Sequence, residues 1–191
     1  MKELVEAIQS YGVGIGNDIV KVDMFLNHRI DTDLLVKMGQ SFHDIFADAA
    51  PDIILTVEAS GIAIATAVAI TFNNIPVVFA KKSATKNATD AVYEAPVYSY
   101  THGKLNHVRV ATPYLPPKSR VLIVDDFLAN GEAVLGLCSL VEQADSTVVG
   151  VGICVEKGFQ PGRSRIEAAG YSVSSLATII SIENGKLLVR D

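Results

Sequence analysis

The sequence predicts an α/β fold built on a doubly wound parallel sheet. Short apolar runs of strand length alternate with segments of helical periodicity, a rhythm typical of a parallel sheet covered by helices on both faces. The length of 191 residues fits one domain. Hydrophobic residues make up 49 % of the chain and charged residues 19 %, which is enough apolar material for a large core and argues against disorder.

Four apolar runs are predicted to be strands of this sheet. They are rich in β-branched residues and show no alternation with polar residues, as expected of strands that are buried on both faces. The runs are Ile53–Val57, Ile75–Ala80, Val121–Val124 and Thr147–Val155.

Helical patterns separate these runs. Residues 33–48 place apolar side chains on one stripe, with Asp31, Thr32 or Asp33 as alternative N-caps. Residues 61–72 are small and apolar all round, as expected of a helix packed closely on a sheet. Two further helices are expected at 131–143 and, before a glycine stop, at 165–169.

Two regions depart from the strand and helix rhythm. Residues 83–112 hold a polar stretch and then two alternating β patterns, around 98–100 and 105–110, which predict an antiparallel hairpin. A flexible loop is expected at about 83–104, because long excursions are often mobile and functional. Residues 11–30 and 172–189 are expected to form a small hood beside the sheet. The whole chain, 1–191, is then a single domain with a hood subdomain.

Charge and hydropathy exclude several classes of protein. The 16 basic and 21 acidic residues give a net charge of −5, so no nucleic-acid partner is expected. The longest apolar stretch, residues 62–70, is about half the length of a membrane span. The N-terminus lacks the basic region and apolar run of a signal peptide. We therefore expect a cytoplasmic protein without a membrane partner.

The metal-binding and disulfide residue types show no site-like spacing. Cys138 and Cys154 lie inside apolar stretches, which favours buried core thiols over a disulfide or a zinc site. The four histidines are scattered along the chain. No metal site formed by protein side chains is expected.

The most specific signal is an apolar strand that ends in two carboxylates, Asp125 and Asp126. The small-residue turn Ala129-Asn130-Gly131 follows and opens a helix. Backbone N–H groups at such a turn and at a helix N-terminus can bind a phosphate, and the carboxylates can accept hydrogen bonds from vicinal hydroxyls. The pattern favours an anion-and-sugar site over an ordinary capped strand-to-helix turn.

This motif resembles the type I phosphoribosyltransferases, which combine an apolar strand, two acids and a small-residue phosphate loop. The segments DDFLANG (125–131), EKGFQPGR (156–163) and VDMFLNH (22–28) resemble the bacterial xanthine branch of that family. The resemblance runs from near residue 1 to about residue 185. It implies the type I fold with a hood and a flexible loop, and a homodimer.

The resemblance also implies a reaction. The 5-phosphoribosyl group of 5-phosphoribosyl 1-diphosphate would be transferred to N9 of xanthine, giving xanthosine 5′-monophosphate and diphosphate. Mg²⁺ would be bound mainly through the diphosphate substrate. Asp125 and Asp126 would be the catalytic acids that hold the ribose hydroxyls.

Within the phosphate loop, the resemblance assigns 5-phosphoribosyl 1-diphosphate binding to Ala129, Asn130, Gly131, Glu132 and Ala133. Most type I enzymes carry Thr or Ser in this loop, so here backbone amides and the Asn130 amide must replace hydroxyl donors. Glu132 is unusual, because a carboxylate beside a phosphate is repulsive unless it points into solvent.

The purine would be bound by Val20, Asn27 and Lys157, with Phe159 as a candidate for stacking on the ring. The segment Glu58–Gly61 resembles the pyrophosphate loop of these enzymes. Lys81 and Lys82 would supply cations for it. Each assignment has a non-functional alternative. Segment 58–61 could be a plain turn, Lys81 and Lys82 could be a solvated surface pair, and Lys157 could extend from the strand end into solvent.

Other base specificities and a non-catalytic role remain open at this point. Adenine is disfavoured, because its 6-amino group is a donor and Lys157 can only donate. A hypoxanthine-guanine enzyme is harder to exclude, because the Asn27 amide can accept from a 2-amino group or donate to a 2-oxo group. A transcription regulator that senses phosphoribosyl diphosphate is less favoured, since such regulators carry a DNA-binding domain or a basic face.

Overall fold

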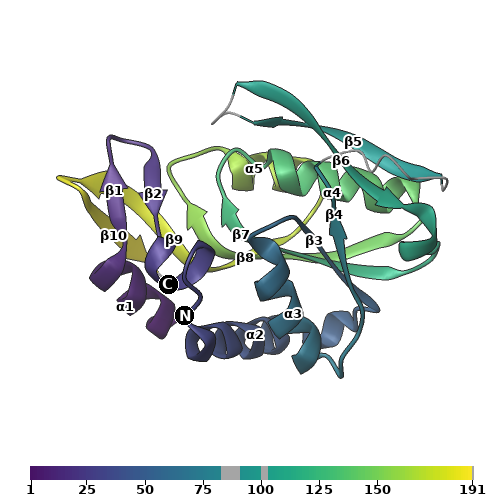
Figure 1. Ribbon diagram of the computed structural model, residues 1–191, viewed down its shortest axis with the longest axis horizontal. Helices are drawn as coiled ribbons and strands as arrows, with labels where there is room; N and C mark the ends of the chain where they lie inside the picture. Colours follow the sequence, from purple (N-terminus) through teal and green to yellow (C-terminus); the bar gives the residue numbers. More distant parts are fainter. Residues whose placement is uncertain (83–90, 100–102, 191) are drawn as a thin grey trace.

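The fold is a six-stranded sheet with helices on both faces, seen in a computed structural model that describes residues 1–82, 91–99 and 103–190 (Figure 1). The strand order is β10-β9-β8-β7-β3-β4. Neighbouring strands from β4 to β9 are parallel, and β10 is antiparallel to β9. The strands are β3 (Ile53–Val57), β4 (Val77–Ala80), β7 (Arg120–Leu128), β8 (Thr147–Lys157), β9 (Val173–Glu183) and β10 (Lys186–Arg190).

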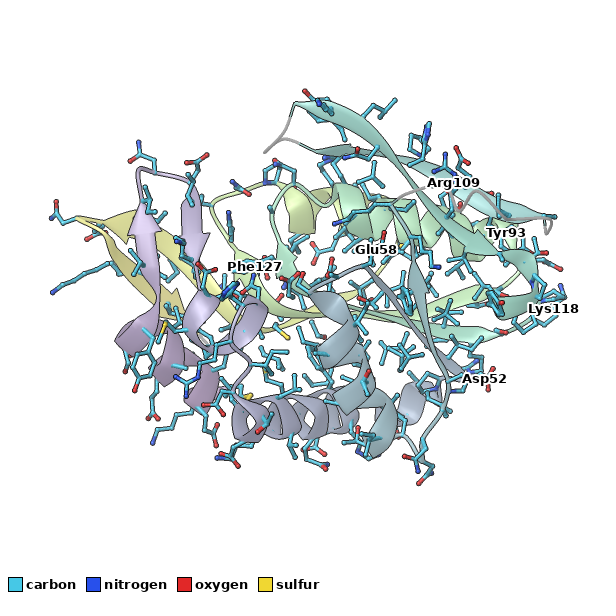
Figure 2. All side chains as sticks on the ribbon, viewed as in Figure 1. Asp52, Glu58, Tyr93, Arg109, Lys118 and Phe127 are labelled. Carbon is cyan, nitrogen blue, oxygen red and sulfur yellow. The ribbon has the colours of Figure 1, made fainter. Side chains whose placement is uncertain are left out.

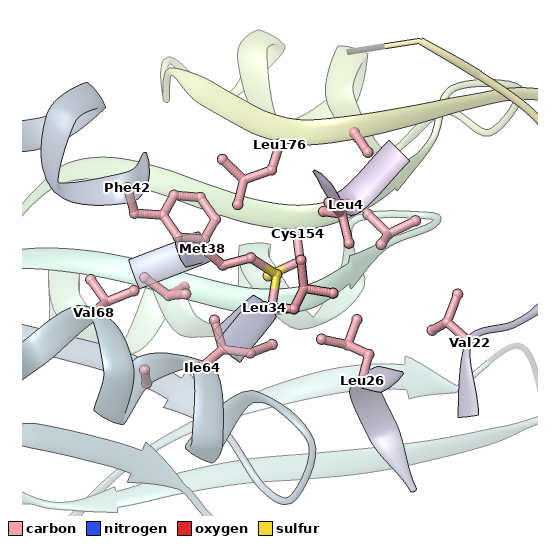
Figure 3. Close-up of a cluster of buried hydrophobic side chains, with 14 of the residues drawn as sticks. Leu4, Val22, Leu26, Leu34, Met38, Phe42, Ile64, Val68, Cys154 and Leu176 are labelled. Carbon is pink, nitrogen blue, oxygen red and sulfur yellow. The ribbon is translucent and has the colours of Figure 1, made fainter. Parts of the chain in front are cut away.

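Two hydrophobic clusters, one on each face of the sheet, hold the helices in place. The first lies beneath α1 (Lys2–Tyr11), α2 (Thr32–Phe46) and α3 (Gly61–Thr71), and includes Met38 and Phe42, which are fully buried (Figure 3). The second lies beneath α4 (Glu132–Gln143), α5 (Gly162–Ala168) and a β-hairpin. This two-sided burial explains why β3, β7 and β8 are continuous apolar runs. The predicted α/β fold class is confirmed.

The four predicted strands are confirmed, and two of them are longer than the apolar runs. β7 continues to Leu128, so Asp125 and Asp126 lie within the strand rather than after it. The reason is that its ladder with β8 extends to the pair Leu128↔Glu156. Between Val121 and Leu122 the register with β8 shifts by one residue, so that Val149 forms a bulge.

The predicted helices are also present, with small changes at their starts. Of the three alternative N-caps of α2, Asp31 is the cap, since its carboxylate accepts from the N–H groups of Asp33 and Leu34, both at 3.1 Å. α5 begins at Gly162, three residues before the expected start. The sequence analysis did not predict α1.

The first part of the expected hood consists of β1 (Val13–Ile15), β2 (Ile19–Lys21) and the π-helix η1 (Asp23–Asn27). The hairpin β1–β2 lies beside the end of β9 and β10 (Figure 1). At the contact, the Gly14 N–H donates to Gly185 O at 3.0 Å. A Cβ at Gly14 would lie 2.3 Å from the Ile182 side chain, so only glycine permits this approach.

The C-terminal segment 172–189 was expected to lie beside the sheet, and both of its strands instead belong to the sheet. β9 pairs parallel with β8 from Val173 to Ile179. The remainder of β9 pairs with β10 next to the hood. The segment lacks the continuous apolar run of an inner strand because several of its side chains are only partly buried.

The predicted antiparallel hairpin is formed by β5 (Val92–Ser99) and β6 (Lys104–Ala111). Residues 92–99 are thus a strand within the segment 83–104 that was expected to be a flexible loop. Full pairing with β6 orders them, and the Gln143 side chain of α4 bonds both backbone groups of Glu94. Residues 83–90 and 100–102 of the expected loop lie outside the described residues.

Two short 3-10 helices, η2 (Ala47–Ala49) and η3 (Thr112–Tyr114), complete the secondary structure of the described ranges. Within residues 1–82, 91–99 and 103–190, no helix is long and apolar enough to cross a membrane.

A substitution at Gly152, on β8, would test how tightly α2 packs on the sheet. A Cβ at this position would lie 2.8 Å from the ring of Phe42 and 3.2 Å from the ring of Phe46. We expect Gly152→Ala to lower the free energy of unfolding by about 1–3 kcal/mol, because the buried rings have no space to move into. Urea denaturation measures this change.

The matched control is the double variant Gly152→Ala/Phe42→Leu, in which a smaller side chain faces the new methyl group. Its loss of stability should be less than the sum of the two single losses. Additive losses would contradict overpacking as the cause.

Candidate active site

The candidate site lies at the carboxyl edge of the parallel sheet, where β3, β7 and β8 end. Helices α3 and α4 begin at this edge, and neither has a side-chain cap on its N-terminus. Glu58 follows β3, and Phe127 lies near the end of β7 (Figure 2). Unpaired N–H groups at a helix start favour anions. Ligands of open α/β sheets bind at this edge.

The two acids of β7 are buried side by side. Asp125 and Asp126 are 4 % and 8 % exposed, and the Asp126 N–H donates to Asp125 Oδ1 at 3.0 Å. Burial, and then the charge of Asp126, raises the pKa of the Asp125 carboxyl well above its usual range, while Lys82 acts in the opposite direction. Two buried acceptors so close together favour a ligand that brings hydroxyl donors or positive charge.

Thr56, on β3, is a site residue that the sequence analysis missed. It is fully buried, and its hydroxyl has no hydrogen-bond partner among the described residues. A Cβ at Gly61 would lie 2.0 Å from Thr56 Oγ1 and 3.1 Å from Asp125 Oδ1, so only glycine fits between them. The available signal was one hydroxyl residue inside the apolar run IILTV.

The segment 58–61 is tied to the end of β4. The Lys82 N–H donates to Glu58 Oε1 at 2.7 Å, and the backbone of Lys81 pairs with that of Arg109 in β6. The Glu58–Ala59 peptide bond is cis. The structure therefore brings both predicted lysines next to the predicted pyrophosphate segment.

The phosphate loop, residues 129–133, leads from β7 into α4. Gly131 has φ +83°, a left-handed conformation that favours glycine, and caps α4. Ala129 O accepts from the Gly162 N–H at 3.0 Å, so the start of α5 supports the loop from behind.

Glu132 does not point freely into solvent, as the sequence analysis required of a carboxylate beside a phosphate. Its Oε1 is 2.6 Å from Arg165 Nη1, and its side chain is 23 % exposed. The same Nη1 donates to Asn130 O, also at 2.6 Å. A cation from α5 therefore compensates the charge of this partly buried carboxylate, an arrangement that the sequence analysis did not consider.

The predicted base-binding residues come from the hood and from β8. Asn27, at the end of η1, donates from Nδ2 to Asp126 Oδ2 at 3.2 Å. Lys157, at the end of β8, donates from Nζ to Asp18 O in the β1–β2 turn at 2.8 Å. Burial lowers the pKa of Lys157. Val20, on β2, is half-buried against the first core cluster.

An aromatic ring that the sequence analysis did not single out, that of Phe127, lies next to Lys157. The Lys157 Nζ is 5.8 Å from the centroid of the Phe127 ring. Phe159 lies in the turn before α5 and is 37 % exposed. Phe127 was missed because, between the acids and the phosphate loop, it reads as an ordinary strand residue.

Within the described ranges, no group of three or more His, Cys, Asp or Glu side chains is placed to hold a metal ion. Cys138 and Cys154 are buried and reduced, as predicted. Burial raises the pKa of both thiols.

Comparison with known proteins decides the family. A model of the phosphoribosyl transferase domain matches residues 27–182. The chain belongs to the phosphoribosyltransferase family. Curated relatives of the chain are named xanthine phosphoribosyltransferase. The one from Clostridioides difficile (strain 630) is 50 % identical over 190 residues, covering 100 % of both chains. That of Laribacter hongkongensis (strain HLHK9) is 49 % identical over 187 residues, covering 98 % of both.

Solved structures of phosphoribosyltransferases share the fold. Adenine phosphoribosyltransferase from Rhodothermus marinus DSM 4252 superposes with a TM-score of 0.74 at 18 % identity, covering 94 % of this chain and 100 % of the other. The enzyme from Giardia lamblia, complexed with 9-deazaadenine, gives 0.75 at 17 % identity, covering 91 % and 96 %. This phosphoribosyltransferase therefore has the architecture of its family from end to end.

Asp125→Asn should lower turnover by about 100-fold while making the protein more stable at high pH. The folded-state pKa of Asp125 is raised, so the wild type loses stability as pH rises from the ordinary carboxyl pKa toward the raised one, and the neutral amide does not. Urea denaturation at several pH values and initial rates measure the two effects.

The matched control is Asp52→Asn, because Asp52 lies at the opposite end of the sheet, where Oδ2 accepts from the Arg120 N–H. This control should keep its turnover. A stability difference between Asp125→Asn and the wild type that is constant with pH would contradict the raised pKa of Asp125.

Proposed function

We propose that this phosphoribosyltransferase moves the 5-phosphoribosyl group of 5-phosphoribosyl 1-diphosphate to N9 of xanthine. The products are xanthosine 5′-monophosphate and diphosphate, a purine-salvage reaction. The observation that carries the proposal is the buried pair Asp125–Asp126, which lies directly before a helix N-terminus without a side-chain cap. The full-length relatives named for xanthine support the choice of base.

The sugar phosphate is bound at the end of β7. Backbone N–H groups of Ala129–Ala133 and the first turn of α4 bind the 5′-phosphate. Asp125 and Asp126 accept hydrogen bonds from the two ribose hydroxyls. The C1′–diphosphate bond breaks as N9 attacks C1′, the diphosphate leaves with the bonding electron pair, and the imidazole proton of xanthine passes to the diphosphate or to water. The transition state carries positive charge on the sugar. The two carboxylates stabilise that charge.

The diphosphate leaves toward the segment 58–61, where the N-terminus of α3 and the cations of Lys81 and Lys82 receive it. The donor set fits Mg²⁺, since this ion commonly takes one or two carboxylates together with substrate phosphates and water. Asp125 and Asp126, the buried acids of β7, are the carboxylates that would share the ion with the diphosphate. Bound Mg²⁺ would neutralise charge on the diphosphate leaving group.

The base lies between the hood and the end of β8, with Val20 packing nearby. Asn27 is oriented by Asp126, because a carboxylate can only accept and therefore must face the NH₂ of the amide. The second N–H of that NH₂ group can donate to a 2-oxo group. Lys157 has donors left besides the one given to Asp18 O, and these serve O6 and N7.

This donor-rich arrangement favours xanthine over the alternatives. Guanine, with its 2-amino donor, suits an acceptor at position 2, and adenine, with its 6-amino donor, suits an acceptor at position 6. A hypoxanthine-guanine enzyme is the second candidate, since the Asn27 amide also has an oxygen. The proposal includes a homodimer in the cytoplasm, which sedimentation and cell fractionation would test.

The decisive experiment compares initial rates with xanthine, guanine, hypoxanthine and adenine at fixed 5-phosphoribosyl 1-diphosphate and Mg²⁺. Xanthine should give the highest kcat/KM. A higher value with guanine would establish the second candidate. Binding of 5-phosphoribosyl 1-diphosphate without turnover of any base would instead support a sensor protein.

Asn27→Ala should weaken kcat/KM for xanthine by about 10- to 100-fold, because a buried 2-oxo group loses its donor. Hypoxanthine has no substituent at position 2, so its kcat/KM should fall much less. The selectivity ratio between the two bases is the measurement. This ratio changes if Asn27 recognises the substituent at position 2. A general effect of Asn27 on Asp126 would instead lower kcat/KM for both bases and leave the ratio unchanged.

Lys157→Ala serves as the comparison variant. Both bases carry the 6-oxo group, so both should lose activity and the ratio should stay near that of the wild type. If Asn27→Ala also leaves the ratio unchanged, Asn27 does not read position 2.

A further inference from the structure

The phosphate loop contains a charge that conflicts with its proposed ligand. Glu132 is the first residue of α4, at the helix end where the 5′-phosphate is proposed to bind. The N-terminus of a helix stabilises either anion, so a free carboxylate there would compete with and repel the phosphate. The carboxylate must be neutralised for the loop to work.

Arg165 supplies the compensating charge from a different helix. Its Nη1 is 2.6 Å from Glu132 Oε1 and donates to Asn130 O at 2.6 Å. The two side chains are 37 % and 23 % exposed, so the pair is partly shielded from solvent and weakly screened by salt. One cation thus holds the side chain and the backbone of the loop at once.

The contact between α5 and the loop is close enough to transmit this effect. Gly162 donates its N–H to Ala129 O at 3.0 Å. A Cβ at Gly162 would lie 2.3 Å from that same oxygen, and one at Gly131 would lie 3.1 Å from Gly162 O. The loop therefore rests on α5 through backbone contacts, and Arg165 adds an ion pair with Glu132.

The neighbouring arginine of α5 cannot take over this role. Arg163 is engaged by Glu156 in a bidentate pair, with Nη2 2.6 Å from Oε2, and it also bonds Glu167 and Val173 O. Arg165 is therefore the cation of α5 that serves the phosphate loop.

We propose that Arg165 is a positioning residue for 5-phosphoribosyl 1-diphosphate: it neutralises Glu132 and fixes Asn130, so that the loop presents its N–H groups to the 5′-phosphate. Arg165 acts through the loop and does not itself touch the substrate. The inference rests on the proposed function, because it assumes that residues 129–133 bind that phosphate.

A charge series of four proteins tests the inference. Relative to the wild type, Arg165→Met leaves the loop one negative charge richer and Glu132→Gln one positive charge richer. The double variant has the local charge of the wild type. The KM for 5-phosphoribosyl 1-diphosphate should rise about tenfold in Arg165→Met and fall severalfold in Glu132→Gln. In the double variant it should return most of the way to the wild-type value.

A merely structural role for Arg165 predicts a different result. Loss of a structural tie would impair Arg165→Met and the double variant alike, because Glu132→Gln replaces no lost contact of Arg165. The KM for xanthine should stay near the wild-type value throughout the series, since the effect is confined to the phosphate. Arg120→Met is the matched control, because Arg120 bonds carbonyls of Ala49 and Ala50 at the far end of β7.

If Arg165→Met does not fold, Arg165→Gln carries the test, because it keeps a donor for Asn130 O and loses only the charge. The inference would be overturned by a KM for 5-phosphoribosyl 1-diphosphate that is unchanged in Arg165→Met or Arg165→Gln. A double variant as impaired as Arg165→Met would also overturn it. Failure of the proposed function looks different. In that case the wild type itself shows no turnover and no binding of 5-phosphoribosyl 1-diphosphate in calorimetry.

Discussion

The structure depends on the parallel pairing of β7 with β3 on one side and β8 on the other. Parallel strands end at the same edge of a sheet, so this pairing brings the acids of β7, the turn after β3 and Lys157 of β8 to one place. It also buries β7 on both faces, which allows a pair of carboxylates to be held 4 % and 8 % exposed. Outside the sheet, the two carboxylates of β7 would be fully exposed to water.

Hydrogen-bond donors and positive charges surround the buried carboxylates of Asp125 and Asp126. Asn27 and the backbone of Asp126 donate to the carboxylates, and the Lys82 charge acts on Asp125. Two helix starts add partial positive charge at the same edge. Beside the acids, the Thr56 hydroxyl is fully buried without a hydrogen-bond partner among the described residues.

The sequence predicted the inner part of the fold well, because strands buried on both faces must be continuously apolar. β9 was misplaced because it lies near the sheet edge, where many of its side chains are only partly buried and the apolar pattern weakens. The acids and the loop after them could be proposed as one site from the sequence because they are contiguous. The pair Glu132–Arg165 was not, since its members are separated by the whole of α4 and β8 and carry no local signal. Phe127 and Thr56 look like core residues in any local window.

The bulge at Val149 has a consequence for how the site could change. Side chains alternate between the faces of a strand, so one extra residue decides which face every later side chain of β8 occupies relative to β7. With the bulge, Lys157 lies over Phe127 and reaches the hood. Without it, the same lysine would face the opposite layer, next to α5. The position of Lys157 at the candidate site thus depends partly on the parity of a strand, and deletion of one residue at the bulge would turn Lys157 away from the hood without removing any residue of the candidate site.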